Sequence, residues 1–85
     1  MKNSLDVRLL LQAFNIVTAK GQLNDGVYSL DSVEAFTDFD GYTCFLKYQQ
    51  VMVTLMFHNK YQVDSPSEEA LERFERRLNK LLKYQ

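Results

Sequence analysis

Residues 33–57 read VEAFTDFDGYTCFLKYQQVMVTLMF, and the expected sheet is built around this stretch. An Asp-Gly pair, Asp40-Gly41, lies between two runs in which apolar and polar residues alternate. This arrangement is a strong signal of a β-hairpin with a two-residue turn, in which both turn residues take positive φ. Gln49-Gln50 is a weaker candidate for a second turn of the same length, because Gln is not favoured at positive φ. The stretch therefore predicts three antiparallel strands joined as a meander.

The turn at Asp40-Gly41 also sets the register of the strands, and facing residues share one side of a sheet. The predicted pairs are Glu34–Lys47, Ala35–Leu46, Phe36–Phe45, Thr37–Cys44, Leu46–Val53, Cys44–Leu55 and Tyr48–Val51. One side is apolar and is expected to face helices: Val33, Ala35, Thr37, Phe39, Tyr42, Cys44, Leu46, Tyr48, Val51, Val53, Leu55 and Phe57. The other side is polar with an apolar centre: Glu34, Phe36, Asp38, Thr43, Phe45, Lys47, Met52, Thr54, Met56 and His58.

The first expected helix runs from Ser4 to Lys20, where apolar residues recur at helical spacing. Ser4 or Asn3 is placed to cap its start, and Gly21 follows Lys20 as a glycine just beyond the helix end.

A second helix is expected between residue 65 and about Lys83. Ser65 is its predicted N-cap, Pro66 takes the first helical position, and Glu68 completes a capping box. Its apolar stripe is Leu71, Phe74, Leu78, Leu81 and Leu82.

The remaining segments complete the fold prediction. Residues 21–26, GQLNDG, read as a loop, and Val27 to Leu30 form an optional fourth strand at the edge, turned by Asp31-Ser32 into Val33. Residues 58–64 are expected to prolong the third strand and then leave the sheet. The predicted fold is α+β, a two-layer α-β-β-β-α domain over residues 1–85, with a three- or four-stranded antiparallel meander and both helices on one face.

Composition narrows the classes of protein that fit. A chain of 85 residues with 46% hydrophobic and 25% charged residues is ordinary for one small globular domain. The single cysteine, the lack of a secretory leader and the lack of an apolar run of about 18–20 residues predict a cytoplasmic protein without a membrane span. The GQLNDG loop lacks the Lys and the following helix of a phosphate loop, so no cofactor is expected.

Charge is distributed unevenly along the chain. Between Gly21 and Leu46 there are acids but neither Lys nor Arg, whereas the second helix begins with acids and ends with bases. The helix macrodipole prefers that order, which accounts for the basic cluster without a function. The order of elements resembles double-stranded RNA-binding domains, but these use a basic start of the last helix, and here it is acidic. We therefore expect no nucleic-acid partner.

Two short motifs carry a second resemblance. TDFDGYT at 37–43 and FHNKY at 57–61, together with the LDS turn before them and the amphipathic C-terminal helix, resemble a family of short gammaproteobacterial proteins of unknown function. The resemblance implies a bacterial, intracellular protein and brings no activity or ligand with it.

An apolar patch is the first candidate site. Phe36, Phe45, Met52 and Met56 fall on the polar side of the predicted sheet, where an exposed apolar group often marks an interaction surface. Coverage by another segment of the chain is the alternative. Acidic residues between 25 and 40 offer a further surface for a basic partner.

A second candidate site lies near the first turn. In the predicted register His58 comes close to Asp38 and Asp40, and such a group could bind a divalent cation or transfer a proton. Ordinary turn chemistry explains the same residues, and they lack the spacing of a metal motif. Cys44 is expected on the apolar side, buried and inert.

These observations favour a small binding or regulatory module that acts through protein–protein contacts, with a homodimer as the main expectation. The alternative is a small enzyme or metal-binding protein with its site at Asp38, Asp40 and His58.

Overall fold

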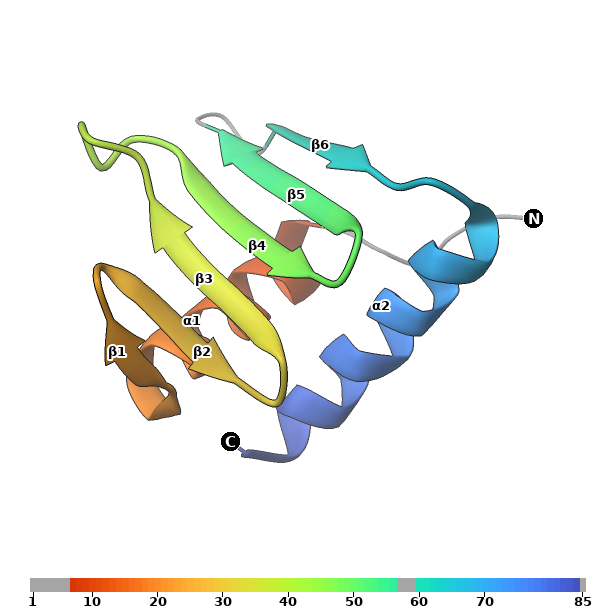
Figure 1. Ribbon diagram of the computed structural model, residues 1–85, viewed down its shortest axis with the longest axis horizontal. Helices are drawn as coiled ribbons and strands as arrows, with labels where there is room; N and C mark the ends of the chain where they lie inside the picture. The colour runs from red at the N-terminus through yellow and green to blue at the C-terminus, as the bar shows by residue number, and fades with distance from the viewer. Residues whose placement is uncertain (1–6, 57–59, 85) are drawn as a thin grey trace.

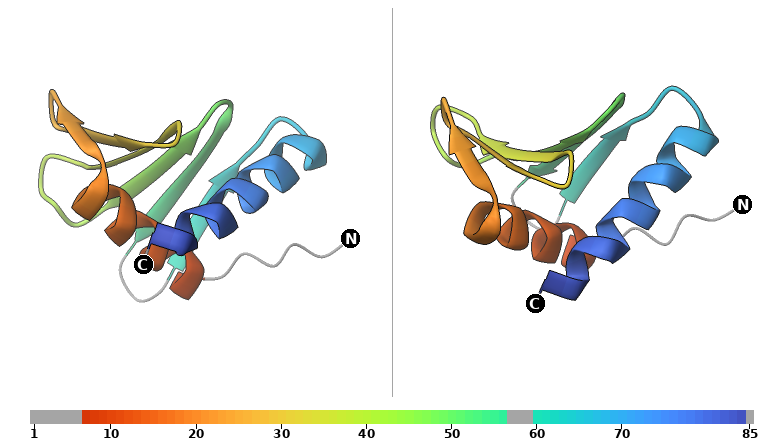
Figure 2. Two further views of the ribbon diagram at one scale, coloured as in Figure 1. Left: turned by 90° about the horizontal axis from the view of Figure 1, so that it is seen from below. Right: turned by 60° about the horizontal axis from the view of Figure 1, so that its bottom comes forward.

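The computed structural model describes residues 7–56 and 60–84. In chain order its elements are α1 (Val7–Lys20), β1 (Gln22–Asn24), β2 (Val27–Leu30), β3 (Val33–Thr37), β4 (Cys44–Tyr48), β5 (Val51–Met56), β6 (Lys60–Asp64), α2 (Glu68–Leu81) and the 3-10 helix η1 (Leu82–Tyr84). Both α-helices lie on the same face of the sheet, as the two views of Figure 2 show. The fold is therefore α+β, with one layer of helices and one of strands.

The sheet has six strands in the order β1-β2-β3-β4-β5-β6, and each neighbouring pair is antiparallel (Figure 1). The predicted meander of three or four strands was wrong. Segment 21–26 contains strand β1, and segment 60–64 turns back against β5 as β6 instead of prolonging it. All three residues of β1 are exposed, and the strand is too short to show a pattern. The sequence of β6, KYQVD, does alternate polar and apolar residues, but four of its five residues are exposed, and the same alternation fits a continuation of the preceding strand.

The predicted register of the central strands is confirmed. Ala35 lies opposite Leu46, and Leu46 lies opposite Val53. Strand Val27–Leu30 and its turn are also confirmed, but the strand lies between β1 and β3 and is not an edge. Because the register holds, the side chains expected to face the helices from β3, β4 and β5 do so, and most of them are buried.

The connection between β3 and β4 differs from the predicted two-residue turn. The Asp38 amide donates to the Thr43 carbonyl oxygen at 3.0 Å, which leaves residues 39–42 as a four-residue loop. Gly41 takes a φ of +81°, whereas Asp40 does not take a positive φ. Phe39 and Tyr42, predicted to face inward, are therefore exposed at the loop tip. The register survives because Asp38–Thr43 pairing keeps the same alignment as the pairs inside the strands.

The predicted two-residue turn at Gln49-Gln50 is confirmed, because Tyr48 pairs with Val51 and Gln49 has a φ of 55°. Two further tight turns lie earlier in the chain. Asp25 and Gly26 have φ of 55° and 80° between β1 and β2, and Asp31 and Ser32 have φ of 52° and 69° between β2 and β3. Positive φ at both residues is the pattern of the type I′ hairpin turn. The Asp-Gly rule thus applies at Asp25-Gly26, within the segment expected to be a loop.

The core lies between the sheet and the two helices. Its largest fully buried side chains are Phe74, Leu10, Leu46, Leu78, Leu81, Val17, Val33, Val51 and Val53. They come from both helices and from β3, β4 and β5, so one apolar cluster joins the two helices to the sheet. No side chain with a buried polar nitrogen or oxygen lacks a hydrogen-bond partner within the described residues.

Gly21 follows the end of α1, as predicted, but its role is to let the helix end lie close to the backbone of β2, not to cap the helix in a left-handed conformation. Its amide donates to the Val17 carbonyl oxygen at 2.8 Å, and its φ is not positive. A Cβ atom at this position would clash with the Val17 carbonyl oxygen and would lie 2.8 Å from that of Ser29. Glycine is therefore required because the helix end packs directly on the backbone of β2.

The start of α2 also differs from the prediction. Ser67, not Ser65, is the N-cap: its Oγ accepts a hydrogen bond from the Ala70 amide at 3.1 Å, and its backbone is extended. Ser65 instead donates through its Oγ to the Ser67 carbonyl oxygen at 2.8 Å. The predicted caps of the first helix, Asn3 and Ser4, lie outside the described residues.

Candidate functional site

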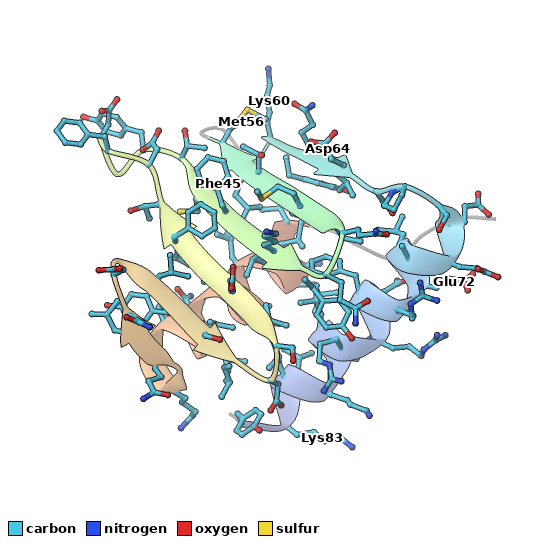
Figure 3. The ribbon with its side chains drawn as sticks, in the orientation of Figure 1. Phe45, Met56, Lys60, Asp64, Glu72 and Lys83 are labelled. Carbon is cyan, nitrogen blue, oxygen red and sulfur yellow. The ribbon has the colours of Figure 1, made fainter. Side chains whose placement is uncertain are left out.

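Two aromatic side chains form the centre of the sheet face that points away from the helices. Phe36 on β3 and Phe45 on β4 are Cα partners, and their rings stack with centroids 5.0 Å apart and planes 20° apart. Both side chains are half-buried. Neither α-helix lies on this face in Figure 2, and Figure 3 looks onto it with Phe45 near its middle.

The two methionines predicted for this patch lie on the neighbouring strand. Met52 and Met56 are both on β5, where Met52 is half-buried and Met56 is 40% exposed. They share the outward side of β5 with Thr54, which is the Cα partner of Phe45. We call Phe36, Phe45, Met52 and Met56 the outer patch.

Charged residues of both signs surround the outer patch. Glu34 lies opposite Lys47, Lys47 opposite Met52, and Met52 opposite Asp64, so one row across four strands carries acid, base, methionine and acid. Lys60 lies opposite Met56 at the far end of β5, as Figure 3 shows. The face is thus an apolar centre with a mixed-charge border.

The second predicted site is only partly described. The Asp38 carboxylate accepts a hydrogen bond from the Gly41 amide at 3.0 Å, while Asp40 is exposed at the loop tip. His58 lies outside the described residues. Among those that are described, no group of three or more His, Cys, Asp or Glu side chains is placed to hold a metal ion. Asp38 therefore has a role in shaping the turn, because its side chain satisfies the backbone there.

Cys44 lies at the start of β4, with its Cα opposite that of Leu55, and is half-buried. Burial, and then the charge of Asp38, raise the pKa of the Cys44 thiol above its ordinary value. The thiol is consequently protonated at neutral pH, and only the thiolate is a strong nucleophile.

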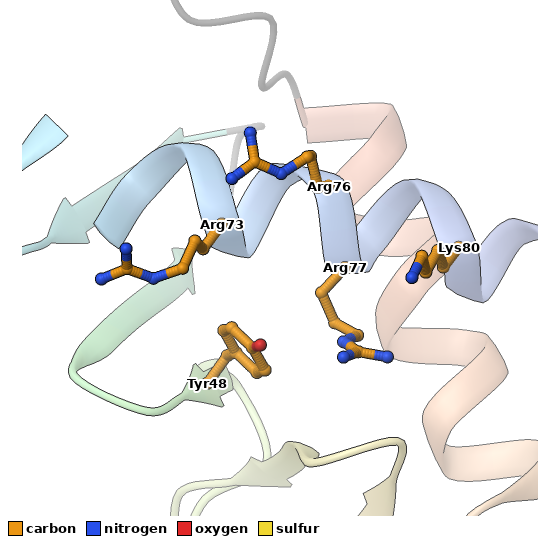
Figure 4. A pocket seen from close by; sticks show the side chains of 5 residues that line it. All are labelled: Tyr48, Arg73, Arg76, Arg77 and Lys80. Atoms are coloured by element: carbon orange, nitrogen blue, oxygen red, sulfur yellow. The ribbon is translucent and has the colours of Figure 1, made fainter. Parts of the chain in front are cut away.

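A pocket that the sequence pattern did not indicate lies between α2 and the β4–β5 turn. It has a volume of about 230 Å³ and is lined by Tyr48, Arg73, Arg76, Arg77 and Lys80. The Arg77 guanidinium carbon is 5.7 Å from the centroid of the Tyr48 ring, a cation–π contact, and the ring also packs on Phe74 in the core. Figure 4 shows the four cationic side chains leaving one helix, with Arg73 and Arg77 on either side of Tyr48.

The pocket cations repel one another along the helix. Arg73 and Arg77, and likewise Arg76 and Lys80, are four residues apart and are therefore neighbours on the helix surface. Each such like-charge pair destabilises a helix by about 0.2–0.5 kcal/mol. The spacing of the cations is visible in the sequence, but the wall that Tyr48 contributes from a distant strand is not.

The macrodipole accounts for only part of this cluster. Lys80 is the base in the last turn of α2, whereas the three arginines precede that turn. The dipole interaction falls off within the last turn of a helix. The interpretation of the whole cluster as a consequence of the dipole is thus incomplete.

The fold and these surfaces define a small two-layer α+β protein with an open sheet face and a basic pocket. A family described as "Protein of unknown function (DUF3081)" matches residues 5–85, and the chain belongs to this family. No match was found among curated proteins or among solved structures. Across residues 7–56 and 60–84, no helix is both long enough and apolar enough to cross a membrane.

Proposed function

We propose that this protein is a small binding module of the bacterial cytoplasm that acts through protein–protein contacts, and that its outer patch joins two copies into a homodimer. The single observation that carries the proposal is the stacked pair Phe36–Phe45 at the centre of a sheet face on which neither α-helix packs. Large apolar groups on an open face lose unfavourable contact with water when a partner covers them.

The border of the outer patch supports a second copy of the chain as the occupant. Two acids, Glu34 and Asp64, and two bases, Lys47 and Lys60, surround the four apolar residues. A two-fold dimer brings the same surface together with itself, so a face with equal numbers of both charges can pair acid with base. A partner with a strongly acidic or basic surface would leave half of these charges opposed by like charge.

The size of the protein also favours association. A chain of 85 residues has a modest core, and small domains often gain stability by association. The aromatic and methionine content of the outer patch matches the composition of interface centres, where Phe and Met are enriched and charged residues are depleted.

Sedimentation velocity over a range of protein concentrations tests the proposal. The parent protein is expected to show a concentration-dependent dimer, and Phe45→Glu or Met56→Lys is expected to abolish it by introducing charge at the interface. Leu23→Glu is the matched control, because Leu23 is 57% exposed on β1, away from the outer patch. A strict monomer at the highest concentration, or an equal loss of dimer in the control, would contradict the proposal.

A further inference from the structure

The geometry points to a second binding function: the pocket between α2 and Tyr48 binds a compact polyphosphate group, carried by a small molecule. Four cationic side chains line one pocket of about 230 Å³, and no carboxylate is among the described residues that line it. The chain holds ten Lys and Arg residues and has a net charge of −1, so this is a local concentration of positive charge on a weakly acidic protein. Such a concentration attracts anions to one place on the surface.

The identity of the cations selects the ligand chemistry. Three of them are arginines, whose planar guanidinium groups donate paired hydrogen bonds to phosphate oxygens, and Lys80 adds a point charge. From Arg73 to Lys80 the helix rises about 10 Å, at 1.5 Å per residue. Charges spread over that length fit several linked phosphates better than a single one.

Tyr48 forms a wall of the pocket and also limits what can bind there. The Tyr48 ring packs against the Phe74 ring in the core, and the Arg77 guanidinium lies over it. Only 7% of the residue is exposed. A nucleic-acid base therefore finds little aromatic surface on which to stack, although stacking on exposed aromatic rings is the usual way to hold single strands. The ring instead fixes the Arg77 guanidinium at the pocket edge.

Acids at both ends of the groove favour a compact anion over a long one. Glu68 and Glu69 occupy the first turn of α2, ahead of the pocket. Near the other end, Tyr84 of η1 donates a hydrogen bond to the Asp31 carboxylate at 2.9 Å, which places an acid beside the C-terminal end of the helix. An extended polyanion running along α2 would meet these carboxylates and those of Glu72 and Glu75, which lie next to the cations along the helix, whereas a compact anion can stay inside the pocket, whose described lining contains no acid.

The spacing of the cations along α2 also favours the binding of an anion in the pocket. Neighbouring positive charges on α2 oppose one another in the free protein. Glu69 and Glu72, four residues before Arg73 and Arg76, offset part of that repulsion, and an anion bound among the cations would relieve the rest. An anion that binds only the folded protein would also raise its free energy of unfolding.

Isothermal titration calorimetry with sodium tripolyphosphate tests the inference directly. We expect saturable binding with one ligand per chain, and binding that weakens as salt is raised. Arg73→Gln and Arg77→Gln are each expected to weaken the affinity about tenfold or more, since each removes a charge-assisted hydrogen-bond donor. Lys20→Gln is the matched control, because it removes the same charge from the exposed end of α1, outside both the pocket and the outer patch, and it should change the affinity less than about twofold by the screening of distant charges.

The variants also keep the outcome interpretable. Arg77 packs on Tyr48, so its replacement can disturb local structure, but Arg73 is exposed and its replacement tests the charge alone. The inference is overturned if tripolyphosphate binding does not saturate, or if Lys20→Gln weakens binding as much as the pocket variants do. It is also overturned if a short RNA duplex binds the same residues more tightly than tripolyphosphate does.

Discussion

The Tyr84 hydroxyl donates a 2.9 Å hydrogen bond to the Asp31 carboxylate, and this contact ties the end of the described chain to the turn between β2 and β3. The hydrogen bond, and then the negative charge of Asp31, raise the pKa of the Tyr84 phenol above its ordinary value. Both effects favour the neutral phenol, because ionisation would place a second anion beside the carboxylate.

Asp31→Asn is therefore expected to lower the pKa of Tyr84, measured from its ring resonances in a pH titration. Because the folded-state pKa is raised, the contact stabilises the fold below the ordinary pKa of tyrosine, and the contribution is lost as pH rises through the folded value. Asp25→Asn is the control, since Asp25 occupies the equivalent position of the β1–β2 turn. An unchanged Tyr84 pKa in Asp31→Asn would show that the hydrogen bond is absent in solution.

Leu46→Ala tests the inward face of the sheet. Leu46 is fully buried between Ala35 and Val53 on β3 and β5, so its truncation is expected to lower the free energy of unfolding by about 2–5 kcal/mol. The neighbouring outward residue gives the comparison, with Lys47→Ala expected to cost less than about 1 kcal/mol. Urea denaturation measures both, and a cost below about 0.5 kcal/mol for Leu46→Ala, the size typical of surface positions, would mean that the faces are reversed.

Gly21→Ala tests the close approach of α1 to β2. The added Cβ would meet the backbone oxygens of Val17 and Ser29, which cannot move without shifting the helix or the strand. Overpacking of this kind costs about 1–3 kcal/mol in thermal or urea unfolding. Gln22→Ala, at an exposed neighbouring position, is expected to stay within about 0.5 kcal/mol of the parent; equal effects would remove the steric explanation.

A pair of serine variants decides which residue caps α2. Ser67→Ala removes the acceptor for the Ala70 amide and is expected to cost about 1 kcal/mol of unfolding free energy. Ser65→Ala should cost less than about 0.5 kcal/mol, because the Ser65 hydroxyl donates to a carbonyl that water can also satisfy. The opposite order of the two costs would restore Ser65 as the cap.

The reactivity of Cys44 reports its environment. Alkylation by iodoacetamide, followed by mass spectrometry, is expected to rise with pH only at a midpoint above the ordinary thiol pKa, because burial and the charge of Asp38 both disfavour the thiolate. Asp38→Asn should lower the midpoint while an Asn side chain still accepts the Gly41 hydrogen bond, and Asp40→Asn should not. A midpoint at or below the ordinary value would show that the thiol is open to solvent.

The parts of the fold that could be predicted are those in which the sequence pattern repeats. From Val33 to Met56, apolar residues alternate over three strands, and any slip of register would expose Leu46 and Val53, so the alignment is strongly determined. Strand β1 has no such pattern, because all three of its residues are exposed and its existence depends on the turn at Asp25-Gly26. An Asp-Gly pair indicates a turn, but the length of the turn also depends on tertiary contacts of the flanking strands, which the local sequence does not show.

The candidate sites divide in the same way. The outer patch follows from strand register alone, so the alternation of residues is enough to pair Phe36 with Phe45. The basic pocket needs Tyr48, the last residue of β4, to approach α2. Arg73 to Lys80 follow Tyr48 by 25–32 residues in the sequence, so this contact is long-range. Helical spacing places the cations on a common face, but the opposing wall belongs to tertiary structure.

The strict sequence of neighbours in the sheet, from β1 through to β6, bears on how the chain reaches its native state. Each strand pairs with the strand just before it along the chain, so the hydrogen bonds between neighbouring strands join residues that are close in sequence. Proteins built from such local contacts have low contact order, and their rates of folding are correspondingly high. The docking of α1 beside α2 and the hydrogen bond from Tyr84 to Asp31 join segments that are far apart in the sequence, so we expect these contacts to form last.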